Sequence, residues 1–248
     1  MTNKTLLLFD VDNTISISRG SISQEMADML KTLSKDYDLA TVSGSDLPKM
    51  LEQLGDTAMY FKWLFTENGL VTYFDHQIDS PYNKTSLINE IGQDYYNEFV
   101  NSVLKELSKI NIPIKRSNFI ELRNGLVNIC PIGRDCTQQE RDDFEKYDKN
   151  HLIRQNLCDK LRIKYGDKLT FSIGGQISID VFPVGWNKTF CLQFIQSKYD
   201  NIYFFGDKTM PGGNDYEISV DSRITMSYSV VSWKNTYEIL KLIRNKII

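Results

Sequence analysis

The stretch TLLLFDVDNT, residues 5–14, decides the fold and gives the first indication of a site. Its apolar half reads as a buried strand, and the carboxylates of Asp10 and Asp12 follow directly. Open α/β sheets bind ligands at the carboxyl ends of their parallel strands. Side chains two residues apart on an extended chain point the same way, so these two acids ionise together only near a positive charge. Mg²⁺ suits such an oxygen-rich site, although a lone Asp-x-Asp is more typical of an ordinary strand-ending turn.

Helices and strands alternate after this stretch, which predicts an α/β domain with a Rossmann-like, mostly parallel sheet. Apolar residues at helical spacing predict a first helix; they are Ile22, Met26, Met29, Leu30 and Leu33. Ser21, with Gln24 three residues later, resembles a capping box for it. A strand over 39–42, a short helix capped by Asp46, a strand over 63–65 and a hairpin through 70–74 follow.

The pattern changes near residue 83, where one long helix is predicted from about Ser86 to Lys109. Asn124-Gly125 and Gly174-Gly175 each separate two apolar runs, which is a strong hairpin signal. Helices are predicted between these hairpins at about 138–147 and 150–164, and the α/β pattern resumes near Asn187. We therefore expect a core made of residues 1–82 and 186–248, with an inserted α+β unit over 83–185 that carries an antiparallel sheet.

Composition excludes several classes of protein. The 248 residues carry a formal net charge of −3, whereas nucleic-acid binders usually show a basic excess. No apolar run approaches the roughly 20 residues that span a bilayer. Four cysteines without a Cys-x-x-Cys pair favour a reduced, cytoplasmic protein, and two histidines leave little room for histidine-based metal or triad chemistry. No nucleic-acid or membrane partner is expected.

Three more motifs stand where a strand ends or a helix begins. Asp207, in a Gly-rich loop after a hydrophobic strand, could complete a metal site with Asp10. Ser43 and Ser45 open the helix after the second strand and suit a phosphate oxygen, or simply cap the helix. Lys188 could neutralise a transferring phosphoryl group, although a single lysine is most often solvated surface.

Arginine is unevenly distributed along the chain. Six of the nine arginines lie in the middle third, at 116, 123, 134, 141, 154 and 162. The planar guanidinium fits pairs of phosphate or carboxylate oxygens, so a cluster favours an anionic ligand. Any single one of these residues is equally well explained as a solvated surface charge.

Taken in order, the Asp-x-Asp, Ser, Lys and Gly-Asp elements resemble the haloacid dehalogenase superfamily of phosphotransferases, with the inserted unit as its cap. Longer strings resemble eukaryotic-type phosphomannomutases and cover nearly the whole chain. They are FDVDNT (9–14), ENGLV (67–71), FIELRNGLVN (119–128), PIGR (131–134), FSIGGQISIDVFPVGWNK (171–188) and FFGDKTMPGGNDYEI (204–218).

The resemblance implies an isomerase that interconverts mannose 6-phosphate and mannose 1-phosphate, through an aspartyl phosphate and a hexose 1,6-bisphosphate, and so supplies mannose 1-phosphate for GDP-mannose synthesis and glycosylation. Asp10 would be the nucleophile, Asp12 the general acid and base, and Lys188 with Ser43 or Ser45 would steady the phosphoryl group. Further residues match positions that bind the distal phosphate and the sugar; they are Arg19, Arg123, Arg134, Arg141, Ser178 and Asp180. Arg116, Arg154 and Arg162 match none and are expected at the surface.

By the same resemblance, Mg²⁺ would be held by Asp10, the Asp12 backbone carbonyl and Asp207, with Asn214 and Asp215 in support. A second cation would bind at Asp221 and the Ser219 carbonyl. A trace of hexose bisphosphate would activate the enzyme, and the chain would form a homodimer through the inserted unit.

Two departures from the family bear on the site. Asn13 stands where the family usually has Gly, and because Asn tolerates a left-handed backbone we expect Asn13→Gly to leave turnover within tenfold. Ser43 stands where animal relatives often have Gly.

Three alternatives to a phosphomannomutase remain. A hexose-phosphate phosphatase on the same fold would not need the distal arginines, and a phosphoglucomutase would use the same contacts as a phosphomannomutase. A catalytically dead binding protein would have a broken nucleophile or metal site, whereas Asp10, Asp12, Lys188 and Asp207 are all present.

Overall fold

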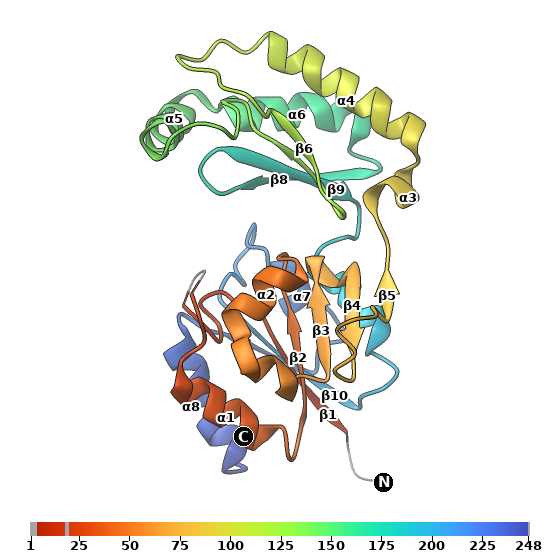
Figure 1. Ribbon diagram of the computed structural model, residues 1–248, viewed down its shortest axis with the longest axis vertical. Coiled ribbons are helices and arrows are strands. Elements are labelled where there is room, and N and C mark those ends of the chain that lie inside the picture. The colour runs from red at the N-terminus through yellow and green to blue at the C-terminus, as the bar shows by residue number, and fades with distance from the viewer. Residues whose placement is uncertain (1–3, 18–19, 248) are drawn as a thin grey trace. The chain divides into compact units, whose positions relative to one another are not determined.

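The computed structural model describes residues 4–17 and 20–247, which form two compact units (Figure 1). The core unit runs up to Lys84 and resumes at Gly185, and the inserted unit is Thr85–Val184. The first boundary lies two residues after the expected one, and the second lies one residue before it.

A seven-stranded sheet in the order β11-β10-β1-β2-β3-β4-β5 forms the centre of the core unit. Its strands are β1 (Thr5–Phe9), β2 (Asp38–Val42), β3 (Trp63–Thr66), β4 (Val71–Phe74), β5 (Asn83–Lys84), β10 (Asn201–Gly206) and β11 (Met226–Ser229). The strands from β11 to β3 pair in parallel, whereas β4 pairs antiparallel with both β3 and β5. The predicted α/β fold with a mostly parallel sheet is therefore confirmed.

The apolar run of β1 is explained by burial on both sheet faces, as is usual in parallel sheets. Leu7 and Phe9 pack with α1 (Gln24–Leu33), α2 (Leu47–Leu54) and α8 (Trp233–Arg244) on one face. Leu6 and Leu8 pack on the other face with η3 (Lys188–Phe194) and α7 (Tyr216–Ser219). A short η1 (Gly55–Tyr60) follows α2, and η2 (Glu67–Gly69) joins β3 to β4.

The predicted capping box of α1 is wrong by two residues. Ser23 is the cap, because its backbone is extended and its hydroxyl accepts the Met26 N–H at 3.3 Å, so the helix begins at Gln24. Asp46 caps α2 as expected, and its carboxylate accepts the Lys49 N–H at 3.1 Å.

The inserted unit contains an antiparallel sheet in the order β6-β7-β9-β8, with helices on one face (Figure 1). Its elements are α3 (Leu87–Ile91), α4 (Gln93–Ser108), β6 (Ile120–Leu122), β7 (Val127–Ile129), α5 (Gln138–His151), α6 (Ile153–Tyr165), β8 (Leu169–Gly174) and β9 (Ser178–Pro183). Both predicted hairpins form. The single long helix is wrong: Gly92, at a φ of 82°, separates α3 from α4 because a left-handed residue ends an α-helix.

Across residues 4–17 and 20–247, no helix is both long enough and apolar enough to cross a membrane. All four cysteines are free thiols and buried.

Candidate active site

The turn after β1 places Asp10 at the carboxyl edge of the core sheet. The Val11 carbonyl accepts the backbone N–H groups of Thr14, Ile15 and Ser16, which closes a tight turn. Asn13 lies in this turn with a φ of 58°, the left-handed conformation that Asn tolerates. The Asp10 side chain is buried, and its Oδ2 accepts the Thr14 hydroxyl at 3.1 Å.

Lys188, the first residue of η3, joins two of the predicted acids. Its Nζ lies 2.5 Å from Asp10 Oδ1 and 2.5 Å from Asp215 Oδ1, and all three residues are buried. Burial lowers the pKa of Lys188, but the two carboxylates outweigh it and hold the pKa above its usual range. The ammonium therefore stays charged between two carboxylates. The sequence alone left open a position on the solvent-exposed surface, and the structure shows a buried one.

Asp207 and Asp215 complete a cluster of three carboxylates. Asp10, Asp207 and Asp215 each offer an oxygen, and these three atoms lie within 4.8 Å of one another. A Cβ on Gly206 would meet the Asp215 carboxyl carbon at 2.9 Å, so the absence of a side chain there lets Asp215 approach the strand end. The Asp215 Oδ2 accepts the Lys208 N–H at 3.1 Å.

The charges of this cluster fit a hard divalent cation. Burial among like charges raises the pKa of Asp10 to about 6 despite the opposing effect of Lys188. Burial also raises the pKa of Asp207, which Asn13 opposes through a 3.1 Å hydrogen bond from Nδ2 to Oδ2. Three ionised carboxylates and one ammonium leave a charge of −2, and oxygen donors are what Mg²⁺ prefers.

Asp12 lies outside this cluster, held by a residue that no sequence motif indicated. Gln53, on α2, is 2% exposed, and its Nε2 donates to Asp12 Oδ1 at 2.9 Å. The backbone carbonyl of Gln53 also accepts the Ile22 N–H at 2.8 Å, which connects α2 to the segment that precedes α1. A buried glutamine on an amphipathic helix was the available signal, because such a side chain requires a polar partner.

Ser43 and Ser45 follow β2, the strand beside β1. The buried Ser43 hydroxyl accepts the Ser45 N–H at 3.1 Å. The two predicted serines therefore lie at the same carboxyl edge of the sheet as Asp10, because parallel neighbouring strands end on the same side.

The inserted unit carries a connected set of polar groups on one face of its sheet. Register aligns Glu121 with Asn128 and Asn128 with Asp180 across β6, β7 and β9. Asn128 Nδ2 donates to Asp180 Oδ1 at 2.6 Å, and Arg134 Nε lies 2.9 Å from Glu121 Oε2. Ser178 and Asp180 alternate with buried neighbours along β9, so they share one side of the strand as predicted.

Arg123 and Arg141 join the same polar set. Arg123 Nη2 lies 3.0 Å from Glu121 Oε2, and Arg141 Nη2 donates to the Arg134 carbonyl at 2.9 Å. The structure thus brings together all the predicted substrate residues of this unit. Arg19, the remaining predicted substrate residue, lies outside the described residues.

Arg154 contradicts its expected surface position. It is 6% exposed, and its Nε donates to Asp148 Oδ2 at 2.7 Å. Its Nη1 also donates to the carbonyls of Gly175 and Ser178, at 3.0 and 3.2 Å, so it anchors the β8–β9 turn. Arg116 and Arg162 are exposed as expected, and they pair with Glu140 and Asp159.

Of the two residues expected to hold a second cation, Asp221 has its carboxylate paired with a guanidinium. Both Asp221 oxygens accept from the Arg223 guanidinium, at 2.7 and 2.8 Å, and this lowers the Asp221 pKa. The Ser219 hydroxyl donates to the Tyr216 carbonyl at 2.8 Å.

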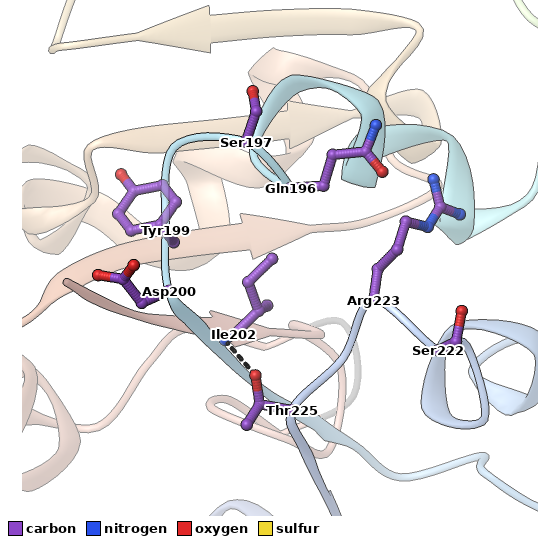
Figure 2. A pocket seen from close by; sticks show the side chains of 8 residues that line it. All are labelled: Gln196, Ser197, Tyr199, Asp200, Ile202, Ser222, Arg223 and Thr225. Carbon is purple, nitrogen blue, oxygen red and sulfur yellow. Dashed lines mark hydrogen bonds between the residues drawn. The ribbon is translucent and has the colours of Figure 1, made fainter. Parts of the chain in front are cut away.

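An open cavity of about 510 Å³ in the core unit lies away from this chemistry (Figure 2). Ile202 and Thr225, at the amino ends of β10 and β11, line it together with Arg223, and Thr225 accepts the Ile202 N–H at 3.1 Å. The acids lie at the opposite ends of the parallel strands, so this cavity is not part of the candidate active site.

This chain is similar to known phosphomannomutases along most of its length. Residues 26–246 match the family model described as eukaryotic phosphomannomutase. Phosphomannomutase 1 of Dictyostelium discoideum is 47% identical over 239 residues, which cover 95% of each chain. The phosphomannomutase of Saccharomyces cerevisiae is 46% identical over 240 residues, covering 96% of this chain and 93% of the yeast protein.

Solved structures with low sequence identity share the fold. A haloacid dehalogenase-like hydrolase from Bacteroides thetaiotaomicron matches 97% of this chain and 99% of its own, with a TM-score of 0.61 at 12% identity. The Plasmodium falciparum IMP-nucleotidase matches 98% of this chain and 63% of its own, with a TM-score of 0.66 at 16% identity.

Proposed function

Because this chain belongs to the eukaryotic phosphomannomutase family, we propose that it interconverts mannose 6-phosphate and mannose 1-phosphate. The observation that carries the proposal is the buried cluster of Asp10, Lys188, Asp207 and Asp215 at the carboxyl edge of the core sheet. Phosphoryl transfer between two anionic groups needs such compensated charge, because a carboxylate cannot otherwise approach a phosphate.

Asp10 is the proposed nucleophile. Lys188 holds its Oδ1 and Thr14 its Oδ2, so the carboxylate is oriented before substrate arrives. Mg²⁺ would be held by Asp10, Asp207, Asp215 and the Asp12 backbone carbonyl, and it would withdraw charge from the bound phosphoryl group. Lys188, together with Ser43 or Ser45, would contact the phosphoryl oxygens.

Asp12 is the proposed general acid and base. As the phosphoryl group passes from the phosphorylated Asp10 to a sugar hydroxyl, Asp12 accepts the proton of that hydroxyl, which gives a hexose 1,6-bisphosphate. The bisphosphate then presents its other phosphate, Asp10 attacks that phosphorus, and Asp12 returns the proton to the departing sugar oxygen. A trace of bisphosphate would start the cycle by phosphorylating Asp10.

The arginines of the inserted unit are the proposed binders of the phosphate that does not react. Arg123, Arg134 and Arg141, with Arg19 from the core, would hold it, and Ser178 and Asp180 would bind sugar hydroxyls. The connected polar face of the inserted sheet supports this role, because guanidinium groups match phosphate oxygens in pairs.

We also propose a cytoplasmic homodimer that supplies mannose 1-phosphate for GDP-mannose synthesis. Buried free thiols support a reducing compartment. Exposed apolar side chains on α4 and α6, Leu104 and Ile163, support a contact through the inserted unit. Sedimentation equilibrium of the full chain would test the dimer, and a monomer at micromolar concentration would contradict it.

An Asp10→Asn variant tests the chemistry. We expect its turnover of mannose 1-phosphate to fall by at least about a thousandfold, because an amide cannot form the covalent intermediate. Asp28→Asn, at an exposed position on α1, is the matched control and keeps parental activity. Wild-type turnover by Asp10→Asn would contradict aspartyl-phosphate chemistry.

A further inference from the structure

Asn13 contacts the carboxylate cluster in a way that the reaction scheme does not use. The residue lies in the turn after β1, while Asp207 follows β10, the strand paired beside it. The Asn13 Nδ2 crosses between these two strand ends and donates to Asp207 Oδ2 at 3.1 Å. The Asn13 side chain, after β1, is thus hydrogen-bonded to the Asp207 carboxylate, after β10.

The three clustered acids are held differently. Asp10 receives hydrogen bonds from Lys188 and Thr14, and Asp215 receives them from Lys188 and the Lys208 backbone. Within residues 4–17 and 20–247, the hydrogen bond from Asn13 is the only one that Asp207 receives. Asp207 is also the most exposed of the three acids, so the surrounding protein restricts its side-chain conformation least.

An amide is suited to this task because it orients a carboxylate without neutralising it. A lysine at the same place would cancel one of the charges that attract a divalent cation. The Asn13 amide donates to Oδ2 of Asp207, whose carboxylate also offers an oxygen within 4.8 Å of oxygens of Asp10 and Asp215. Outer partners of this kind typically change metal affinity by about ten- to a hundredfold when they are removed.

The backbone restricts which residue can do this. A φ of 58° is accessible to Gly and tolerated by Asn and Asp, but it is strained for most other residues. Glycine would keep the turn and provide no donor, and aspartate would set a second carboxylate against Asp207. Of these residues, Asn provides both the conformation and a donor.

We propose that Asn13 is a positioning residue that holds Asp207 ready for Mg²⁺, so that its loss weakens metal binding rather than the chemical step. This inference rests on the proposed function, because it takes Asp10, Asp207 and Asp215 as the metal ligands. It agrees with the expectation that Asn13→Gly leaves turnover within tenfold, provided that Mg²⁺ is saturating.

The test is Mg²⁺ binding to the full chain without substrate, measured by isothermal titration calorimetry after removal of metal with EDTA. We expect Asn13→Gly to raise the Kd for Mg²⁺ by about tenfold or more. The matched control is Asn118→Gly, which removes another left-handed asparagine whose amide donates to an aspartate, Asp135, in the inserted unit. Its Kd stays at the parental value.

Thermal unfolding provides a second readout that separates this role from a purely structural one. Each variant is melted with EDTA and with Mg²⁺, and we expect the Mg²⁺-dependent rise in Tm to shrink in Asn13→Gly, whatever its Tm in EDTA. An unchanged Kd and an unchanged Tm rise would overturn the role of Asn13 and leave the proposed function standing. A parent chain that binds no Mg²⁺ would overturn both, and Asp207→Ala, which removes a ligand, fixes the value expected for a lost site.

Discussion

At the scale of single residues, Lys188 compensates the charge of the buried acids. Burying one carboxylate costs several kcal/mol unless it is paired, and here one ammonium lies 2.5 Å from an oxygen of both Asp10 and Asp215. The remaining negative charge is what a divalent cation would compensate. The uncompensated charge therefore lowers the stability of the metal-free fold, and the same charge favours the binding of a cation.

The charged groups of this site leave a local pattern in the sequence, because each follows an apolar strand or begins a helix. Asp10, Lys188 and Asp207 could be predicted in this way. Gln53 and the contact made by Asn13 could not, because a hydrogen bond between side chains 41 or 194 residues apart leaves no local pattern.

The contact of Gln53 leads to a prediction about turnover. Gln53→Leu removes the amide that donates to Asp12 and replaces it with an apolar, helix-compatible side chain. A hydrogen bond to a charged group contributes about 1.5–3 kcal/mol, so we expect kcat to fall by about ten- to a hundredfold with little change in KM. Steady-state kinetics with mannose 1-phosphate measures this.

Gln24→Leu is the control for Gln53→Leu. Gln24 also donates to an aspartate, Asp28, but it lies at an exposed position on α1. Parental kinetics are expected for this variant. If Gln53→Leu also retains its parental kcat, Gln53 has no part in positioning Asp12.

At the scale of elements, sequence periodicity predicted the elements better than the way they are joined. Both hairpins of the inserted unit and the mostly parallel sheet of the core were predicted from apolar runs and turn residues, whereas the order of the core strands was not. The break at Gly92 was missed because an isolated Gly is compatible with a helix and becomes a stop only when it adopts a positive φ. The burial of Arg154 was missed because its partner, Asp148, and the carbonyls it binds come together only in three dimensions.

The anchoring of the β8–β9 turn by Arg154 predicts a large effect on stability. Arg154→Met leaves Asp148 buried without its cation, and breaking one side of such a pair costs about 3–5 kcal/mol. Urea unfolding of the full chain measures the loss. We expect Asp148→Leu combined with Arg154→Met to recover most of it, since no charge then remains buried. A loss below about 1 kcal/mol in Arg154→Met would show that the pair does not hold the turn.

At the scale of the whole molecule, the clustered acids and most of the arginines lie in different units. The cluster of Asp10, Asp207 and Asp215 lies in the core unit, whereas six of the nine arginines lie in the inserted unit, so the mild net charge of −3 says little about either group. The predicted core and insertion match the two compact units closely because the sequence changes its periodicity at both crossings.

The buried thiols of both units predict how stability depends on pH. Burial raises the pKa of Cys130 and Cys158 to about 11, from an ordinary value of 9.0. In the unfolded chain these thiols ionise first, so the stability that they contribute is complete below pH 9.0 and is lost as pH rises toward about 11. Urea midpoints measured across this range should fall less steeply in Cys130→Ala with Cys158→Ala than in the parent. Equal slopes would contradict the burial of these thiols.

We propose that this chain isomerises a hexose phosphate through phosphorylated Asp10 rather than releasing the phosphate to water. The most direct measurement follows mannose 1-phosphate by ³¹P NMR with the purified chain, Mg²⁺ and a trace of hexose 1,6-bisphosphate. We predict that the signal of mannose 6-phosphate grows as that of mannose 1-phosphate declines, with no matching release of inorganic phosphate. Inorganic phosphate appearing without mannose 6-phosphate would contradict the account and identify a phosphatase.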